Sequence, residues 1–99
     1  MDVKSLQRFT GYVLYGVDLK DLLERVVAYA NGCQKLVFDS SLANLAREVC
    51  GGSADLERLE SPEDVARHLA RGKLVVIPVE PPASGVSSIA LLTGLRKRS

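Results

Sequence analysis

The strongest constraint on the fold is a helix followed at once by a buried strand, within residues 16–41. Apolar side chains repeat at intervals of three and four residues along its first part, which is the spacing of one helical face. The repeating residues are Leu19, Leu22, Leu23, Val26, Val27 and Ala30. Asp18 stands where an N-cap is needed, and Gly32 is placed to supply the left-handed residue that ends a helix. The next residues, Leu36-Val37-Phe38, are continuously apolar and predict a short strand covered on both faces.

The rest of the chain predicts further strands and helices. Segments that are β-branched or aromatic predict strands at residues 11–15, 73–80 and 86–92. Helical spacing predicts helices at residues 42–50 and 62–70, each preceded by serines that can act as N-caps. The chain therefore alternates strands and helices before it ends in two consecutive strands.

The order of these elements predicts a fold class. Strand–helix–strand units favour parallel pairing, and the short turn at residues 81–85 favours an antiparallel hairpin. Residues 53–60 are compatible with either a helical turn or a short edge strand. We therefore expect one α/β domain over residues 1–99, of the two-layer α+β type, with a basic tail at residues 96–99. Its mixed sheet should have four or five strands and two or three helices.

Composition argues against several classes of protein. The chain has 99 residues, 46% of them hydrophobic, and no apolar run approaches the roughly 20 residues of a membrane-spanning helix. Its first residues do not form a signal-peptide pattern. The formal net charge is only +1, whereas proteins that bind nucleic acid are usually more basic. Arg exceeds Lys, and Asn and Gln are few, which suggests a thermophile. We expect a cytoplasmic protein without a membrane partner.

The two cysteines and the one histidine do not predict a metal site. Cys33 and Cys50 form no CxxC pair, so the four-ligand pattern of a structural zinc site is missing and no metal or other cofactor is expected. A disulfide between them is an open alternative, but reduced thiols in a cytosolic protein are the favoured prediction. His68 is predicted to be a solvated helix residue.

Asp39 and Glu80 are the candidate catalytic residues. Each follows a predicted buried strand, and open α/β sheets place their ligand sites at such strand ends. The segment Leu-Val-Phe-Asp-Ser-Ser-Leu resembles the opening strand and Asp of PIN-like metal-dependent nucleases. Metal-assisted cleavage needs a cluster of several carboxylates, and the pattern places only these two. Asp39 and Ser41 are therefore better interpreted as turn and N-cap residues, and the sequence favours a non-catalytic role without deciding whether the protein is an enzyme.

The layout as a whole resembles the Alba family of archaeal chromatin and RNA-binding proteins. Gly16 before the first helix, Gly32 after it, and Val86-Ser87-Ser88-Ile89 at the last strand carry this resemblance. It implies an archaeal protein with an Alba-like fold and a role in binding nucleic acid.

Two departures from the family bear on that role. Val17 and Asp18 stand where the family has lysines, and Asp39-Ser40-Ser41 replaces a basic turn. An Asp in each turn repels phosphate, so the usual nucleic-acid surface of the family is expected to be missing. Tyr12 and Tyr15, three apart on a strand, should point to opposite faces and cannot form a stacking platform for bases.

The favoured function is a non-catalytic interaction module that forms homo-oligomers or serves as a subunit of a larger assembly, which could include nucleic acid. Its predicted contact surface is the apolar hairpin with Val86, Ile89, Leu91 and Leu92. The alternative is direct binding of DNA or RNA, which a one-sided clustering of cations would favour. The cations concerned are Arg96, Lys97, Arg98, Lys35 and Arg8, with Lys4 as a further candidate. A small nuclease centred on Asp39 is the third hypothesis.

Overall fold

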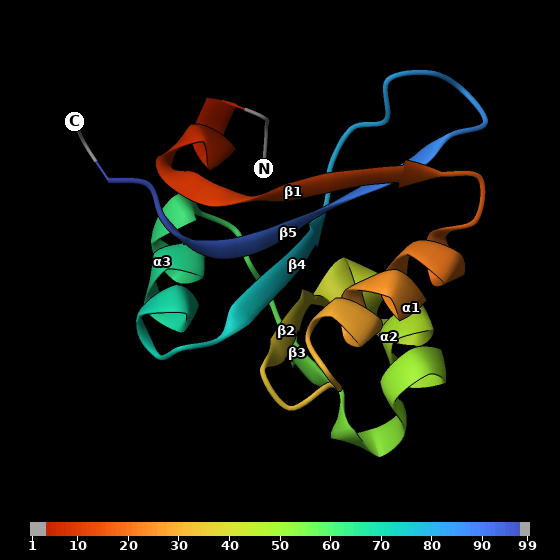
Figure 1. Ribbon diagram of the computed structural model, residues 1–99, viewed down its shortest axis with the longest axis horizontal. Coiled ribbons are helices and arrows are strands. Elements are labelled where there is room, and N and C mark those ends of the chain that lie inside the picture. Colours follow the sequence, from red (N-terminus) through yellow and green to blue (C-terminus); the bar gives the residue numbers. More distant parts are fainter. Residues whose placement is uncertain (1–3, 98–99) are drawn as a thin grey trace.

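The computed structural model describes residues 4–97, which form a five-stranded mixed sheet with three α-helices (Figure 1). The elements are β1 Phe9–Gly16, α1 Leu19–Tyr29, β2 Leu36–Asp39, α2 Ala43–Cys50, β3 Asp55–Glu57, α3 Pro62–Ala70, β4 Leu74–Pro78 and β5 Ser87–Leu95. Three short 3-10 helices, η1 Lys4–Arg8, η2 Ser40–Leu42 and η3 Gly51–Ser53, complete the order. The predicted α+β class, the mixed sheet and the C-terminal antiparallel hairpin are confirmed, and the undecided segment contains a short edge strand. The expected two-layer arrangement is wrong, because helices lie on both faces of the sheet.

The strands lie in the order β1-β5-β4-β2-β3. β2 is parallel to both β3 and β4, whereas β5 is antiparallel to β4 and β1. The connection through α1 leads from β1 to β2 and the connection through α2 from β2 to β3, so both run across the sheet toward β3. The connection through α3 runs in the opposite direction, from β3 back to β4. Right-handed crossovers require connections of opposite direction to lie on opposite faces. Accordingly, α1 and α2 cover one face and α3 lies on the other, so each face of the sheet is partly covered by helices (Figure 1).

Two apolar clusters fill the spaces between the sheet and its helices. The first lies under α1 and α2 and contains Leu22, Leu23, Val26, Leu36, Phe38, Leu42, Ala46, Val76, Ile89 and Leu91. The second lies under α3 and η1 and contains Leu6, Phe9, Leu59, Val65, Val75, Ile77, Val79, Ala90 and Leu92. Successive residues of β4 and β5 alternate between the two clusters, because side chains of a strand point to alternate faces. These two strands are therefore buried on both sides.

The predicted contact surface on the C-terminal hairpin is wrong. Ile89, Leu91 and Leu92 expose 0%, 2% and 4% of their surface. The reason is that β5 lies between β1 and β4 instead of at the edge. The apolar side chains of this strand form the core and are not available to a partner.

The helix starts agree with their sequence signals in two of three cases. Asp18 caps α1 by accepting a hydrogen bond from the Lys20 N–H at 3.0 Å. Ser61 and Asp64 form a reciprocal capping box at the start of α3. The predicted serine cap of α2 is wrong, because its N-cap position is Leu42 without a side-chain bond.

The end of α1 is also shifted by one residue from the prediction. Asn31, with φ of 57°, takes the left-handed position first, and Gly32 follows with φ of 122°. Asn tolerates this conformation better than other residues with a side chain, so the chain turns before it reaches the glycine.

The prediction of reduced thiols is wrong. Cys33 and Cys50 form a disulfide with a Cα–Cα distance of 6.0 Å, which ties the connection after α1 to the last residue of α2. His68 also differs from its prediction, since it is only 9% exposed and lies on the side of α3 that faces the sheet, near Val65. None of the helices in the described residues is long and apolar enough to cross a membrane.

Candidate interaction surface

Asp39 lies where its pattern placed it, but its carboxylate is engaged in holding the fold. β2 and β3 are neighbours whose following helices lie on opposite faces, and such a switch point is where open sheets bind ligands. Here Asp39 Oδ1 accepts from the Leu59 N–H at 3.1 Å, and Oδ2 accepts from the Ser41 N–H at 3.2 Å and from the Ser41 hydroxyl. Asp39 therefore ties the end of β2 to the segment after β3.

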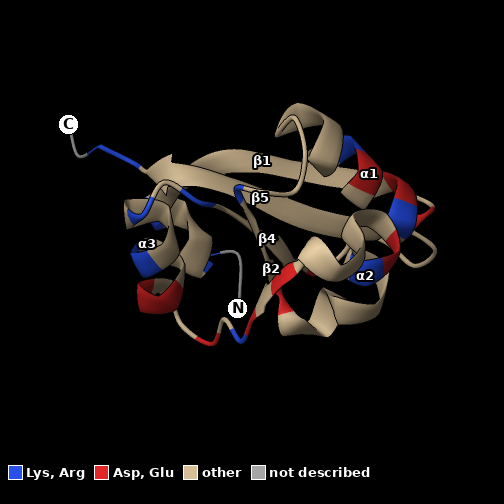
Figure 2. Cartoon of the chain, turned by 90° about the horizontal axis from the view of Figure 1, so that it is seen from below, with Lys and Arg blue, Asp and Glu red and all other residues tan. Residues whose placement is uncertain are grey.

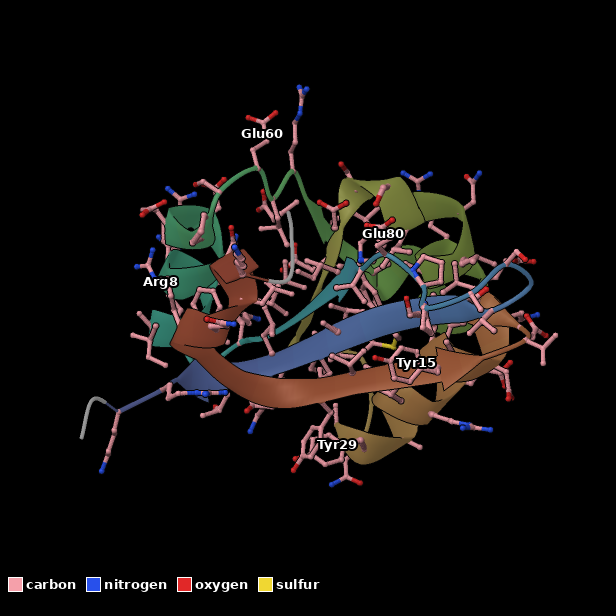
Figure 3. All side chains as sticks on the ribbon, turned by 90° about the horizontal axis from the view of Figure 1, so that it is seen from above. Arg8, Tyr15, Tyr29, Glu60 and Glu80 are labelled. Carbon is pink, nitrogen blue, oxygen red and sulfur yellow. A yellow bond between two sulfur atoms is a disulfide. The ribbon has the colours of Figure 1, made fainter. Side chains whose placement is uncertain are left out.

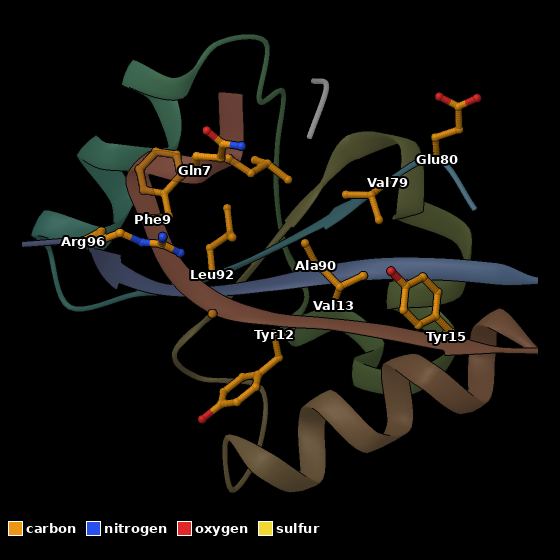
Figure 4. Close-up of a pocket in the computed structure, with 12 residues that line it drawn as sticks. Gln7, Phe9, Tyr12, Val13, Tyr15, Val79, Glu80, Ala90, Leu92 and Arg96 are labelled. Atoms are coloured by element: carbon orange, nitrogen blue, oxygen red, sulfur yellow. The ribbon is translucent and has the colours of Figure 1, made fainter. Parts of the chain in front are cut away.

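The structure does not bring Glu80 together with Asp39. In the register of β2 and β4, Asp39 comes level with Ile77, and Glu80 lies about 10 Å further along the chain at 3.3 Å per residue. Glu80 is exposed and points away from the sheet (Figure 4). Within residues 4–97, no three His, Cys, Asp or Glu side chains are grouped so that they could hold a metal ion. The nuclease hypothesis thus gains no support from the geometry.

The predicted nucleic-acid-binding cations lie near one end of the sheet. Arg8 and Arg96 are adjacent, since the Arg96 N–H donates to the Arg8 carbonyl at 2.8 Å. Lys97 follows Arg96, and Lys35 precedes the first residue of β2. Arg8, Lys35, Arg96 and Lys97 are exposed, as is Lys4 at the start of η1, whereas Arg98 lies outside the described residues.

The most unusual surface is the free edge of the sheet along β1, which we call the β1 edge (residues 9–16). It is an outer strand of eight residues, with the sequence Phe-Thr-Gly-Tyr-Val-Leu-Tyr-Gly, and contains neither charge nor proline. Seven of its eight residues are exposed or half-buried, and large side chains are among them: Tyr12 is 56%, Val13 47% and Tyr15 55% exposed. An outer strand has unpaired N–H and C=O groups along one side, so this edge can accept another strand.

The aromatic side chains of the β1 edge lie on both faces of the sheet. Tyr12 is opposite Leu91 and packs against Tyr29 of α1, with ring centroids 5.6 Å apart in an edge-to-face arrangement. A hydrogen bond with Tyr12 raises the pKa of the Tyr29 hydroxyl above its ordinary value. Tyr15 is opposite Ser88 on the other face, which confirms that the two strand tyrosines point apart (Figure 4).

Each face of the β1 edge has a shallow hollow beside it. On the α3 face, a hollow of about 240 Å³ is lined by Gly11, Val13 and Tyr15 together with Val79, Ala90 and Leu92 (Figure 4). On the α1 face, a hollow of about 460 Å³ is lined by Tyr12, Leu14, Arg25 and Tyr29. The side chains of an added strand, which alternate between faces, could enter both hollows.

Gly11 shapes the α3-face hollow. The pairing of β1 with β5 shifts by one residue between Thr10 and Gly11. A Cβ atom at Gly11 would lie 2.1 Å from the Leu91 carbonyl oxygen, so the close approach of the two strands requires a residue without a side chain. The missing side chain leaves the sheet surface open at this point.

The β1 edge was not identified from the sequence, although a signal was present. Thr10, Tyr12 and Tyr15 carry polar atoms, in contrast to the apolar runs 36–38 of β2 and 74–77 of β4. Such a composition is typical of a strand that is exposed in part. Comparison with known proteins finds no family model, curated protein or solved structure that matches this chain, and the resemblance to the Alba family stays a prediction.

Proposed function

We propose that this protein is a non-catalytic module that associates with a second copy of itself through the β1 edge, so that two five-stranded sheets become one continuous sheet. The observation that carries the proposal is the length and neutrality of this outer strand. Natural sheets protect their edges with short strands, charges or proline, and β1 has none of these over eight residues. Pairing with a second copy would satisfy the free backbone groups and cover the exposed side chains of both strands.

The charges that flank β1 favour antiparallel pairing of two identical copies. Arg8 precedes the strand and Asp18 follows it, and both are exposed. In an antiparallel pair related by a two-fold axis, the start of one strand lies opposite the end of the other. Arg8 of each copy then approaches Asp18 of the other. A parallel arrangement would instead place like charges together.

One register of the two β1 strands places complementary side chains opposite each other. With the axis at Val13, Arg8 lies opposite Asp18 of the other copy, and Gly11 lies opposite Tyr15. The Tyr15 ring would then cover the open surface that Gly11 leaves in the α3-face hollow. Cross-strand packing of an aromatic ring over a glycine stabilises a strand pair, which supports this register.

The first test is the oligomeric state. We expect a dimer in light scattering coupled to size exclusion, and we expect Val13→Lys to be a monomer because two lysines would meet at the axis without a countercharge. Ala70→Lys, which adds the same charge at an exposed position of α3, should remain dimeric. Circular dichroism of both variants controls for folding. A wild-type monomer at high micromolar concentration would refute the proposal.

Cross-linking tests the register. Residues opposite each other in an antiparallel pair have Cα atoms about 4.5–5.5 Å apart, within reach of a disulfide. Val13→Cys should therefore cross-link to its counterpart on mild oxidation. Val17→Cys is the matched control: Val17 is 88% exposed, but the two copies of this residue would lie about 27 Å apart at 3.4 Å per residue. Equal cross-linking of both variants would exclude the proposed register.

A further inference from the structure

We propose that the end of the sheet where β2 and β4 begin binds the phosphate backbone of a nucleic acid. Cations that flank the ends of four neighbouring strands, together with Arg71 after α3, lie at this end, which we call the basic end (residues 8, 35, 71, 73, 96 and 97). The pairing of the strands, which the linear sequence does not reveal, produces this arrangement.

The hydrogen bonds of the sheet define the order of the cations. The Arg96 N–H donates to the Arg8 carbonyl at 2.8 Å, which joins the end of β5 to the start of β1. The Leu74 N–H donates to the Lys35 carbonyl, also at 2.8 Å, which joins β4 to β2. Lys73 Nζ donates to the Gln34 carbonyl at 3.1 Å, so its ammonium group lies beside Lys35.

The β4–β5 register connects these two pairs. Val75 is opposite Leu92, so Lys73 comes level with Gly94, two residues before Arg96. The row from Arg8 to Lys35 crosses three strand spacings, or about 14 Å at 4.8 Å each. A nucleic-acid strand has one phosphate per about 3.4 Å of helix axis, so the row is long enough for about four phosphates.

Few carboxylates neutralise the basic end. Glu63 pairs with Arg8 at 3.2 Å, and Asp55 lies at the start of β3, beyond Lys35. In the part of the chain that the structure describes, the other cations of the basic end form no ion pair: Lys35, Arg71, Lys73, Arg96 and Lys97. Figure 2 shows Lys and Arg along the C-terminal segment and around α3.

Acidic residues lie at the other end of the same strands. They are Asp18 after β1, Asp39 at the end of β2, Glu57 and Glu60 at and after the end of β3, and Glu80 after β4. Figure 3 places Arg8 and Glu80 at opposite ends of the sheet. The net charge of +1 therefore conceals an uneven distribution of charge, and a polyanion is attracted to the basic end and not to the end that holds these carboxylates.

The basic end should contact phosphates and not bases. No exposed ring lies among these cations: Tyr12, Tyr15 and Tyr29 lie on or beside β1, and Phe38 is buried. Phe9 contacts Arg8, but its ring is only 2% exposed and cannot stack on a base. Without rings for stacking, recognition rests on cation–phosphate contacts, which carry no sequence information. We expect similar affinity for strands of different sequence.

The test is fluorescence anisotropy with labelled duplex DNA and single-stranded RNA of mixed sequence. About four phosphate contacts should weaken binding roughly 50- to 150-fold between about 50 and 200 mM salt. The double variant Lys35→Glu/Arg96→Glu should reduce the slope of log affinity against log salt by about two. No binding at the lower salt concentration would overturn the proposal.

A matched control separates the site from net charge. Lys20→Glu/Arg47→Glu removes two exposed cations of α1 and α2 and changes the net charge by the same amount. This variant should retain most of the affinity. An equal loss in both double variants would show that binding follows overall charge, and it would refute a site at the basic end.

Discussion

The two outer strands of this sheet both have unpaired backbone groups along one side. Their sequences differ in whether they protect these groups from pairing with another chain. β3 has three residues, Asp55–Glu57, and two of them are acidic. β1 has eight residues and no charge. Short charged edges resist pairing with another chain, and long neutral edges favour it. The contrast indicates that one edge is kept from contact and the other is available for it.

The contacts that hold the two edge strands in place also differ. The β3 side is braced by the Cys33–Cys50 disulfide and by the bonds of Asp39. The β1 side depends on its pairing with β5 and on the close approach at Gly11. Perturbing these features one at a time should change one edge and leave the other nearly intact.

The largest expected effect is loss of the disulfide. It closes a loop between residues 17 positions apart, and the chain-entropy model gives about 3 kcal/mol for a loop of this size. Denaturation with and without a reductant should show this loss in the free energy of unfolding, and Cys33→Ser/Cys50→Ser should be equally unstable. Reductant should not affect the double variant. A change below about 1 kcal/mol would contradict this account of the β3 side.

Gly11→Ala should affect the β1 side. The added Cβ would meet the Leu91 carbonyl oxygen at 2.1 Å, and a backbone atom can only move with its strand. We expect about 2–3 kcal/mol of destabilisation in urea denaturation, together with weaker self-association because β1 is displaced. Gly52→Ala is the control, since a Cβ there has no neighbour within 4 Å. Equal stability of the two variants would show that β1 adapts freely.

Asp39→Ala tests whether this carboxylate braces the segment next to β3. Two backbone N–H groups, those of Ser41 and Leu59, lose their acceptor, which should cost about 2 kcal/mol. Hydrogen exchange at the Leu59 amide should become faster while amides of β5 keep their protection. Glu80→Ala, an exposed change, should stay within about 0.5 kcal/mol of wild type. If the two variants are equally stable, Asp39 is free for another role.

The smallest effect is a pH dependence at the start of α3, which contacts the residue before β1. The pKa of Glu63 is lowered first by its own backbone N–H and then by Arg8, and the pKa of Asp64 is lowered first by the Glu60 N–H. A carboxylate whose pKa is lowered by folding stabilises the folded state at pH values above its pKa in the unfolded chain. This contribution is lost as the pH falls through its pKa in the folded protein. The free energy of unfolding should therefore decline below about pH 4.5, the ordinary value for Glu63. Glu63→Gln should flatten this decline, and an unchanged profile would contradict the assignment.

Local patterns determined most of the elements of this protein. The segment Ser61-Pro62-Glu63-Asp64 combines a capping serine, a proline in the first turn and acidic side chains, and these act within a few residues of each other. The apolar run Leu36-Val37-Phe38 likewise became a strand buried on both faces. For these segments the physical cause is local, so the sequence was sufficient.

Only the tertiary structure decided which strand lies at the edge and which side chains meet. β5 was expected to form a hairpin that contacts a partner, but β1 pairs with it from the far end of the chain and takes the edge position. The same long-range pairing joins Arg8 to Arg96 and Lys73 to Lys35, which the net charge of +1 conceals. Periodicity records which face of a strand is apolar, whereas strand order depends on crossover handedness and on the burial available to the whole sheet. The elements were therefore readable from the sequence, and both candidate surfaces arose from the order in which the strands pair.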